Sequence, residues 1–481
     1  MAYGPGVTGA GPDPTRALLD VAWSALGGGP ELPDRVRTTG DAAGLLPSTQ
    51  PALPAMVAAV GAATLAAAVL DAARSGRAVP PVGLDVGHVA LAARSERHAR
   101  RAGTTAEDLF APLSRFWATA DGWLRLHANY AWHQERALRV LGCPDTPDAV
   151  AAAVATWRGA DLEDALADGG GVGNAVRTRA EWSAHPQGRA VAARPLLTST
   201  AGAGTARPLG PGRAAEGVRV LDLTRVIAGP VATRTLAAWG AQVLRLDSPR
   251  LPELPAQAVD TLPGKASAAL DLADPAGAAR LEELLAQAHV VVLGYRPGAL
   301  TRFGLDAGSL AGRHPHLTVA TLSAWGPTGP WAGRRGFDSL VQCATGIADA
   351  EGSAGAPGVL PAQVLDHATG YLAAAAVLLA LAGTVRGGPA RSVELSLAST
   401  AHWLTASSPP LAAPEAAAPS PLPAPEAEFL VPLPGAGEEV RVVGPPGRAG
   451  KLVPGWARTT SLGADPAEFP VGRGRSPGAI P

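Results

Sequence analysis

The chain has 481 residues, 47% of them hydrophobic, and a formal net charge of −1. A chain of this length and composition can fill the cores of two to four globular domains, and its near-neutral charge argues against nucleic acid or a membrane surface as a partner. The two cysteines, Cys143 and Cys343, have neither metal-ligand nor redox spacing, which indicates a cytoplasmic protein without a disulfide framework. The N-terminus lacks the basic start and apolar core of a secretion signal, so we expect no segment to be removed.

The two most apolar stretches are residues 54–70 and 371–382. The second is much shorter than the ~20 residues that span a bilayer, and we predict both to be buried helices. Residues 62–95 also resemble residues 371–403, since in each an alanine-rich helix precedes a Gly/Arg turn and a strand. This similarity indicates an internal duplication in which residues 1–103 are a partial N-terminal copy, with chance similarity as the alternative.

Residues 104–197 combine strand-like DGWLRLH with helix-like HQERALRVLG and predict a smaller α+β unit. The composition shifts to Pro, Gly and Ala in residues 198–217 and again in the first part of residues 408–481. Such a composition is typical of extended linkers. The C-terminal segment still contains strand-like EFLVPL and EEVRVV, and we expect roughly its last 20 residues to be disordered.

From residue 218 to 407 short β-branched runs alternate with helical patterns such as PAGAARLEELLAQA. The runs are VRVLDL, QVLRLD, HVVVLGY, LTVATL and SVELSL. This alternation predicts an α/β fold with a Rossmann-like parallel sheet. The first run continues through TRVIAGP into a helix expected to begin near Val231, where free backbone N–H groups could bind an anion. The turn lacks GxGxxG, so a plain strand-to-helix connection remains equally compatible.

The segment GVRVLDLTRVIAGPVATRTLAAWGAQVLRLDSP resembles the opening of CoA-transferase family III, which also includes acyl-CoA racemases. Three further segments resemble the family's next blocks in the same order: GKASAALDLADPAG, VVLGYRPGALTRFGL and SAWGPTGPWAGRRGFDSLVQCATG. The resemblance covers residues 217–403 and implies a large Rossmann-like catalytic domain that binds coenzyme A, with a smaller α+β domain. It also implies acyl-CoA and a carboxylic acid as small-molecule substrates, and a homodimer. Here the smaller domain precedes the large one, the reverse of the family order.

The resemblance places the family's nucleophilic aspartate at Asp366, between a Gly/Pro-rich turn and the second alanine-rich helix. A carboxylate can attack an acyl-CoA thioester, and CoA thiolate would convert the resulting anhydride into an aspartyl-CoA thioester. Thr369 and Gly370 are expected to form a helix end that stabilises the tetrahedral intermediates. Without the resemblance, Asp366 would be interpreted as a helix N-cap. The neighbouring His367 either tunes the site or faces solvent.

In the N-terminal copy the corresponding position falls near Val57 or Ala58, neither of which is a carboxylate. We therefore expect one site per chain. The family blocks also imply residues that contact coenzyme A, with the arginines facing phosphates. They are Ala228, Leu270, Asp271, Tyr295, Arg296, Arg302, Arg335 and Phe337. For each arginine, a solvated surface charge is the alternative.

The sequence departs from the family pattern in three ways. Leu293 and Gly294 stand where Glu-Asn is common, so a side-chain contact to coenzyme A would be lost. Phe337 stands where the racemases have histidine, so the second acid or base needed to invert a carbon is missing. Residues 96–116 contain no glycine-rich loop that could cover the nucleophile, and the GGG segments at 27–29 and 169–171 predict turns.

These observations favour a CoA-transferase that acts through Asp366. An acyl-CoA racemase or isomerase of the same family and a non-catalytic CoA-binding homologue remain as alternatives. The histidines include no HExxH or paired Cys/His spacing, and His314 and His316 flank a proline typical of a turn. We therefore expect no metal. No motif encodes the identity of the acids.

Overall fold

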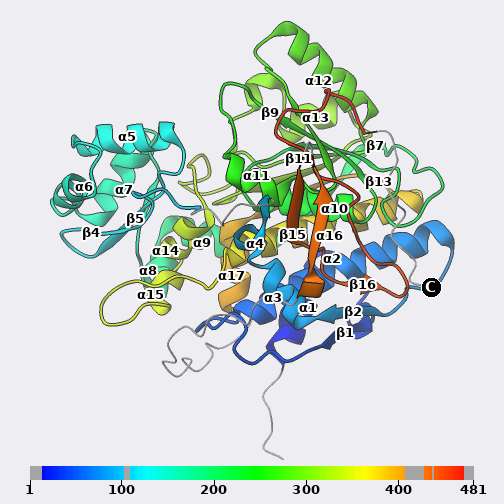
Figure 1. Ribbon diagram of the computed structural model, residues 1–481, viewed down its shortest axis with the longest axis horizontal. Helices are drawn as coiled ribbons and strands as arrows, with labels where there is room; N and C mark the ends of the chain where they lie inside the picture. Colours follow the sequence, from blue (N-terminus) through cyan, green and yellow to red (C-terminus); the bar gives the residue numbers. More distant parts are fainter. Residues whose placement is uncertain (1–12, 102–108, 407–426, 436–437, 471–481) are drawn as a thin grey trace, which may run out of the picture.

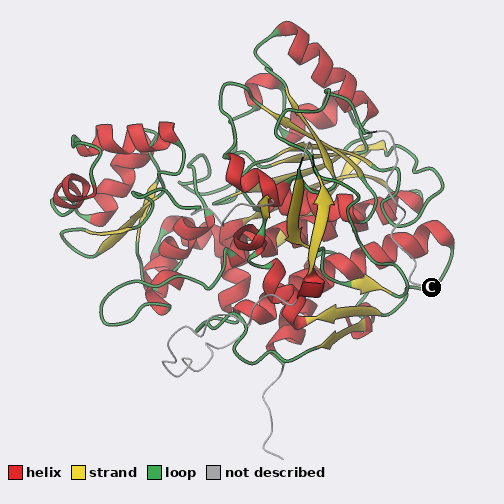
Figure 2. Ribbon diagram, viewed as in Figure 1, coloured by secondary structure: helices red, strands yellow, loops and turns green. Residues whose placement is uncertain are grey.

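The central element is a seven-stranded sheet with the order β10-β9-β8-β11-β12-β13-β7 (Figures 1 and 2). The computed structural model describes residues 13–101, 109–406, 427–435 and 438–470. The strands of the sheet are β7 (Leu197–Thr205), β8 (Arg219–Leu223), β9 (Gln242–Asp247), β10 (Lys265–Ala269), β11 (Val290–Leu293), β12 (Thr318–Ser323) and β13 (Pro389–Ser396). Strands β8 to β13 are parallel, and β7 pairs antiparallel with β13. In chain order the parallel strands read 3-2-1-4-5-6, the doubly wound Rossmann arrangement, which confirms the predicted α/β fold.

Helices cover both faces of this sheet, which is why its central strands are continuous hydrophobic runs. The helices are α10 (Ala228–Ala238), α11 (Pro255–Thr261), α12 (Pro275–Gln287), α13 (Ala307–Arg313), α14 (Asp338–Ala344), α15 (Ile347–Ala350), α16 (Val364–Val385) and α17 (Leu397–Ala406), with a 3-10 turn η2 (Thr301–Phe303). Successive residues of a strand face opposite sides, so Val220 joins the core under α10 and α16 while Leu221 joins the core under α12.

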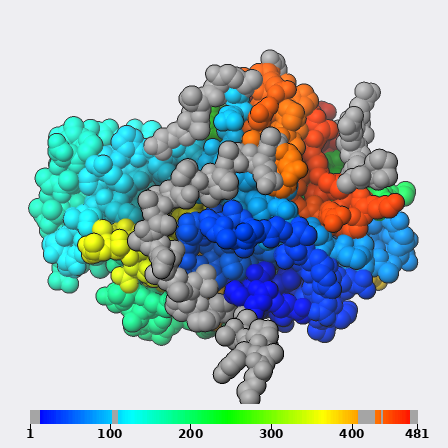
Figure 3. Space-filling view, turned by 60° about the horizontal axis from the view of Figure 1, so that its bottom comes forward, coloured from blue at the N-terminus to red at the C-terminus, as the bar shows by residue number. Residues whose placement is uncertain are grey.

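The N-terminal region lies along one face of the molecule, drawn in blue in Figures 1 and 3. Its elements are α1 (Pro14–Ala25), η1 (Leu32–Arg35), β1 (Val36–Thr39), α2 (Ala52–Ser75), β2 (Val82–Asp85), α3 (Val86–Ala92) and α4 (Ser95–His98). The order α2, β2, α3 repeats the order α16, β13, α17, in line with the predicted duplication. Strand β2, however, pairs with β1 and β16 (Arg448–Ala449) in a separate sheet.

The long helices α2 and α16 pack against each other in the main core. Both are long and apolar enough to cross a membrane by length and composition alone, but most of each is buried inside the protein. Their composition explains this position, because a helix that is apolar all round has no face suited to water. The prediction that these stretches are buried helices is confirmed.

The smaller α+β unit projects to one side, as the cyan part of Figures 1 and 3 shows. It consists of β4 (Phe116–Ala118), β5 (Trp123–Leu126), β6 (Gly173–Ala175), α5 (Ala131–Leu141), α6 (Pro147–Val154) and α7 (Gly159–Asp168), followed by α8 (Arg179–Ala184) and α9 (Pro186–Ala192). Its three strands form an antiparallel sheet with a core of its own. The exact boundaries of the predicted domains stay predictions.

The structure differs from the sequence predictions at the linkers and at two elements of the large sheet. Part of the expected linker 198–217 lies in β7, whose small residues pair through their backbone with β13, and this pairing needs no apolar side chains. Strand β10 was not predicted, and α10 begins at Ala228, before the expected Val231. Most of the second linker and the end of the tail lie outside the described residues.

The described part of the C-terminal segment begins with η3 (Ala427–Phe429). It then forms β14 (Leu430–Pro434) and β15 (Glu439–Val443), and β15 pairs with β3 (Arg100–Arg101). The two strand-like segments of the tail are therefore confirmed as strands.

Candidate active site

A cavity of about 740 Å³ opens at the carboxyl ends of the parallel strands. Ligands of doubly wound folds bind at this edge, where the strand order reverses, here between β8 and β11. Every residue that the family resemblance indicated lines this one cavity: Ala228, Leu270, Asp271, Tyr295, Arg296, Arg302, Arg335, Phe337 and Asp366. The structure thus brings the nine together, although their individual roles stay predictions.

Glycines allow the close approach of the segments at this edge. A Cβ on Gly294, directly after β11, would lie 2.9 Å from the Thr224 side chain, and one on Gly229 would lie 2.3 Å from it. The departure from the family pattern at Gly294 therefore has a local physical reason, since a larger side chain has no room. The first turn of α10 begins at Ala228 and its N-terminus faces the cavity, as expected for an anion site.

The large cavity is strongly basic. Its lining includes the arginines Arg136, Arg225, Arg250, Arg296, Arg302, Arg334 and Arg335, against the carboxyl groups of Asp247, Asp271 and Asp366. Arg250 is paired with Asp271 at 2.8 Å, whereas Arg335 has no carboxylate partner within the described part of the chain. Burial, with the charges of Arg296 and Arg136, lowers the pKa of Arg335. Guanidinium groups in excess over the carboxylates of the cavity, such as that of Arg335, suit a phosphorylated ligand.

Asp366 lies in the first turn of α16, which begins at Val364 after the N-cap residue Gln363. It is therefore not the N-cap. The expectation that Thr369 and Gly370 form a helix end is wrong, because both lie inside α16: the Thr369 hydroxyl contacts that of Thr400 at 2.6 Å, and a Cβ on Gly370 would lie 2.5 Å from a backbone oxygen of α10. These two residues serve helix packing, and their N–H groups belong to the helix.

A second buried aspartate, Asp338, lies beside Asp366. Its carboxylate accepts hydrogen bonds from the Asp366 backbone N–H at 2.9 Å and from the Gln342 side chain. Burial raises the pKa of Asp366 well above its usual value, and the charges of Asp338 and Glu96 add to the effect. Burial also raises the pKa of Asp338. Because Asp338 accepts the hydrogen bonds, we assign it the negative charge and Asp366 the proton when no ligand is bound.

His367 does not face solvent. It is fully buried, and its Nε2 lies 3.0 Å from Glu96 Oε2. Glu96 belongs to α4, and its neighbour Ser95 donates a hydrogen bond to Asp260 at 2.9 Å. The end of the N-terminal region therefore holds the residue next to the candidate nucleophile.

The smaller unit contributes aromatic side chains to the site. His127 stacks on Phe337 with ring centroids 3.5 Å apart and an interplanar angle of 3°. Burial lowers the pKa of His127 well below its usual value, so its ring is neutral at pH 7, and its Nδ1 has no hydrogen-bond partner. The Tyr130 hydroxyl donates to the Glu253 carboxylate, and Arg225 lies 4.8 Å above the Tyr130 ring. These contacts join the two units at the cavity.

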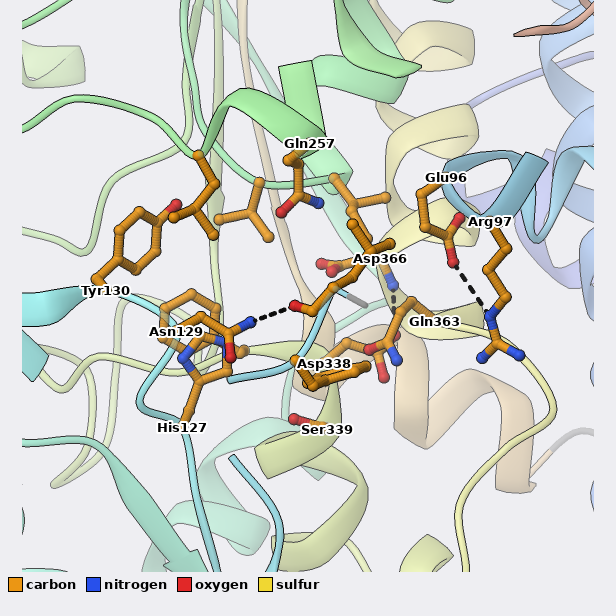
Figure 4. Close-up of a pocket in the computed structure, with 16 residues that line it drawn as sticks. Glu96, Arg97, His127, Asn129, Tyr130, Gln257, Asp338, Ser339, Gln363 and Asp366 are labelled. Atoms are coloured by element: carbon orange, nitrogen blue, oxygen red, sulfur yellow. Dashed lines mark hydrogen bonds and ion pairs between the residues drawn. The ribbon is translucent and has the colours of Figure 1, made fainter. Parts of the chain in front are cut away.

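A smaller cavity of about 270 Å³ is also lined by Asp366 (Figure 4). Both cavities are lined by Tyr130, Val226, Phe337 and Asp366, which therefore mark the boundary between them. Val226 has φ of 66°, a strained conformation for a β-branched residue, and its N–H donates to Glu253 Oε2 at 3.0 Å. Strain of this kind persists where surrounding contacts enforce it, often at functional sites.

A buried ion pair holds strand β8, which leads to Val226 at the boundary between the two cavities. Lys265 Nζ lies 2.8 Å from Asp222 Oδ2 and 2.6 Å from the Thr233 hydroxyl, with both charged side chains fully buried. Burial lowers the pKa of Lys265 to about 8, so the ammonium is still mainly protonated at pH 7. Within the ranges that the structure describes, no group of three His, Cys, Asp or Glu residues could hold a metal ion.

Residues 215–428 match the model of CoA-transferase family III. The match covers 214 of the 481 residues, so this region is similar to the family. Among curated family III relatives, "Probable fatty acyl-CoA transferase Rv3272" of Mycobacterium tuberculosis is 34% identical over 213 residues, which cover 41% of this chain and 53% of the relative. "Acyl-CoA transferase" of Gibberella moniliformis is 31% identical over 303 residues, covering 56% of this chain and 53% of the relative.

Mouse "Succinyl-CoA:glutarate CoA-transferase" is 32% identical over 198 residues, which cover 38% of this chain and 45% of the relative. The chain thus spans about half the length of the curated family III relatives it matches. A crystal structure of Rv3272 is 33% identical, covers 42% of this chain and 57% of that one, and gives a TM-score of 0.38.

Several residues of the candidate site could not be found from the sequence. Asp338 directly follows Phe337 in the block GRRGFDSL, so its nearness to the site had a signal in the chain. Glu96, His127 and Tyr130 lie far from the family blocks along the chain and reach the site only through tertiary contacts, while Glu253 lies between the first two blocks. The sequence carries no local pattern for them.

Proposed function

We propose that the chain is a CoA-transferase that moves coenzyme A from an acyl-CoA thioester to a carboxylic acid through an aspartyl-CoA intermediate at Asp366. One observation carries the proposal: Asp366 lies at the boundary between a large basic cavity and a small cavity. Coenzyme A would occupy the large cavity, with its phosphates at the arginines. The acyl group would lie on the other side of the carboxylate.

The chemistry needs only this carboxylate and the two substrates. Ionised Asp366 attacks the thioester carbonyl, CoA thiolate leaves, and a mixed anhydride forms between Asp366 and the acyl group. The thiolate then attacks the Asp366 carbonyl of the anhydride, which releases the donor acid and leaves aspartyl-CoA. The acceptor carboxylate repeats the two steps in reverse, so acyl-CoA and free Asp366 are formed with no net change in protons.

Residues from both units would hold the reacting groups. The Asp338 carboxylate fixes the backbone of Asp366 through its hydrogen bond of 2.9 Å. Tyr130 and Phe337 line both cavities and would exclude water from the anhydride. The homodimer expected from the family stays a proposal, as does cytoplasmic localisation.

Trapping the intermediate tests the proposal. Incubation with a panel of acyl-CoA donors and hydroxylamine should place a hydroxamate on the peptide that contains Asp366, detected by mass spectrometry. Asp366→Ala should lower turnover at least about a thousandfold, while Asp349→Asn, a change at an exposed aspartate of α15, should leave it unaltered. Full turnover by a correctly folded Asp366→Ala protein would exclude the proposal. Binding of CoA without any trapped adduct across the panel would favour a non-catalytic CoA-binding homologue.

A racemase of the same family is the second candidate, and the stacking of His127 on Phe337 favours it. The sequence has no histidine at position 337, but a neutral imidazole from the smaller unit lies against that ring and lines the small cavity with Asp366. The pair could exchange a proton on the α-carbon of an acyl-CoA. Uptake of deuterium from heavy water into a 2-methylacyl-CoA, without an acceptor acid, distinguishes this reaction from CoA transfer.

A further inference from the structure

The small cavity contains polar groups that the fold leaves unpaired. Within the part of the chain that the structure describes, His127 Nδ1 is buried without a partner. The side chains of Gln257 and Ser339 line the cavity and make no hydrogen bond there, although their polar atoms are not fully buried. Figure 4 shows Gln257 and His127 on opposite sides of Asp366 and Asp338. Buried donors and acceptors are normally satisfied, so such groups around a cavity indicate a ligand that supplies the missing partners.

The rest of the wall is mainly apolar. Leu109, Phe110, Ile227 and Leu254 line the cavity together with Phe337. This lining suits a hydrocarbon segment, whereas the arginine-rich lining of the large cavity suits phosphates. The two cavities therefore offer different chemistry to the two sides of Asp366.

Charge limits what the small cavity accepts. The carboxyl groups of Glu96, Asp338 and Asp366 face it, and the one guanidinium among its lining residues is that of Arg97. Arg97 is largely exposed, and its Nε lies 3.8 Å from Glu96 Oε1, so part of its charge is already offset. A ligand with a second carboxylate would place that charge among like charges in a partly buried space.

Volume limits the length of the ligand. About 270 Å³ is room for about nine water-sized groups at ~30 Å³ each. A carboxyl group and a chain of about four to six carbons fill this space. A fatty acid of twelve or more carbons would have to extend into solvent.

We propose that the small cavity is the acyl subsite and that it selects a short monocarboxylic acid whose chain carries a hydroxyl or oxo group, hydrogen-bonded by Gln257. This inference rests on the proposed CoA transfer and names its acceptor class. The acceptor carboxylate attacks aspartyl-CoA, the C–S bond breaks and CoA thiolate leaves. The thiolate then attacks the acyl carbonyl of the anhydride, and Asp366 leaves as carboxylate.

The test uses the full chain in two stages. Hydroxylamine trapping at Asp366 first shows whether the adduct forms. The acceptors butyrate, 3-hydroxybutyrate, succinate, glutarate and dodecanoate are then compared by kcat/KM. We expect 3-hydroxybutyrate to exceed butyrate, and the dicarboxylates and dodecanoate to fall at least about tenfold below both. An adduct without this order overturns the acyl subsite and leaves CoA transfer standing, whereas no adduct with any donor overturns both.

A variant of Gln257 tests whether the preference for a hydroxy acid arises in the small cavity. Gln257→Leu should lower kcat/KM for 3-hydroxybutyrate about tenfold more than for butyrate, the cost of one lost hydrogen bond. The KM for the CoA thioester should stay the same, because Gln257 does not line the large cavity. The control is Gln287→Leu at an exposed glutamine of α12, and circular dichroism checks folding. Equal losses for both acids would contradict a contact with the hydroxyl group.

Discussion

Helices α2 and α16 are nearly equal in length and composition, and they lie against each other in the core, yet only one of them contributes to a cavity. Both are alanine-rich and buried over most of their length. Neither described cavity is lined by a residue of α2, whereas Asp366 in the first turn of α16 lines both. The helices thus provide the same packing, and the chemistry depends on a single turn.

The surroundings of the two first turns account for this difference. Helix α2 begins after Pro51 without a side-chain cap, and its first turn is packed into the core. The first turn of α16 is held by Asp338, by Glu96 through His367, and by the rings of the smaller unit. Of these two similar helices, only the one to which other elements bring polar groups contributes to the candidate active site.

The largest expected effect on stability comes from the buried ion pair between Lys265 and Asp222, in the large sheet that carries the candidate site. Lys265→Met should lower the free energy of unfolding by about 3–5 kcal/mol, because Asp222 is left as an uncompensated buried charge. Lys451, the other lysine of the chain, is exposed. Lys451→Met should therefore change the free energy of unfolding by less than about 0.5 kcal/mol. Urea unfolding followed by circular dichroism measures both.

A double variant separates the lost pairing from lost packing. Asp222→Asn combined with Lys265→Met should recover part of the lost stability, because the unpaired charge is gone. A double variant no more stable than Lys265→Met alone would mean that the lysine acts mainly through the packing of its chain.

The α2 side of the comparison is tested at Val57, one of the two residues, with Ala58, near which the predicted duplication places the counterpart of Asp366. Val57 is buried in the main core, so Val57→Ala should lower the free energy of unfolding by about 2 kcal/mol through lost burial and a small cavity. CoA transfer should be unchanged at temperatures where the variant is folded. A strong loss of turnover in the folded variant would show that α2 supports the chemistry directly.

The large sheet could be predicted because its hydrophobic runs are local signals. VRVLDL, HVVVLGY and LTVATL became β8, β11 and β12. Strand β10 was missed because KASAA has few β-branched residues, and β7 because its small residues looked like a linker. Both are edge strands built mainly from small or polar residues, which carry little of the β-branched pattern that marks a strand.

The candidate site could be predicted only where the chain itself carries a pattern. Asp366 and the arginines came from the family blocks, and all of them line one cavity. The expected helix end at Thr369 and Gly370 was misplaced, because the start of α16 is set by contacts with Asp338 that no local pattern shows. Contributions from α4 and the smaller unit depend on how distant segments pack, so local sequence cannot reveal them.

The smallest test concerns the proton on Asp366. Its pKa is raised by burial and by the charges of Asp338 and Glu96. The contribution of Asp366 to the free energy of unfolding is therefore fully present below the ordinary aspartate pKa, and it is lost as the pH rises through the raised pKa. Within that window the wild type should lose up to about 1.4 kcal/mol per pH unit relative to Asp366→Asn, which never becomes charged. The Asn variant should therefore be the more stable protein at pH 8, although it is inactive.

Urea unfolding at pH 5, 6, 7 and 8 measures this difference, with Asp349→Asn as the control at an exposed aspartate. Other groups titrate in both proteins and cancel, except Asp338, which also loses a like-charged neighbour in the variant and so adds to the same trend. A difference that stays constant with pH would mean that Asp366 is already ionised in the folded protein at pH 5. The site would then hold a nucleophile ready for attack, and ligand binding would not need to remove a proton first.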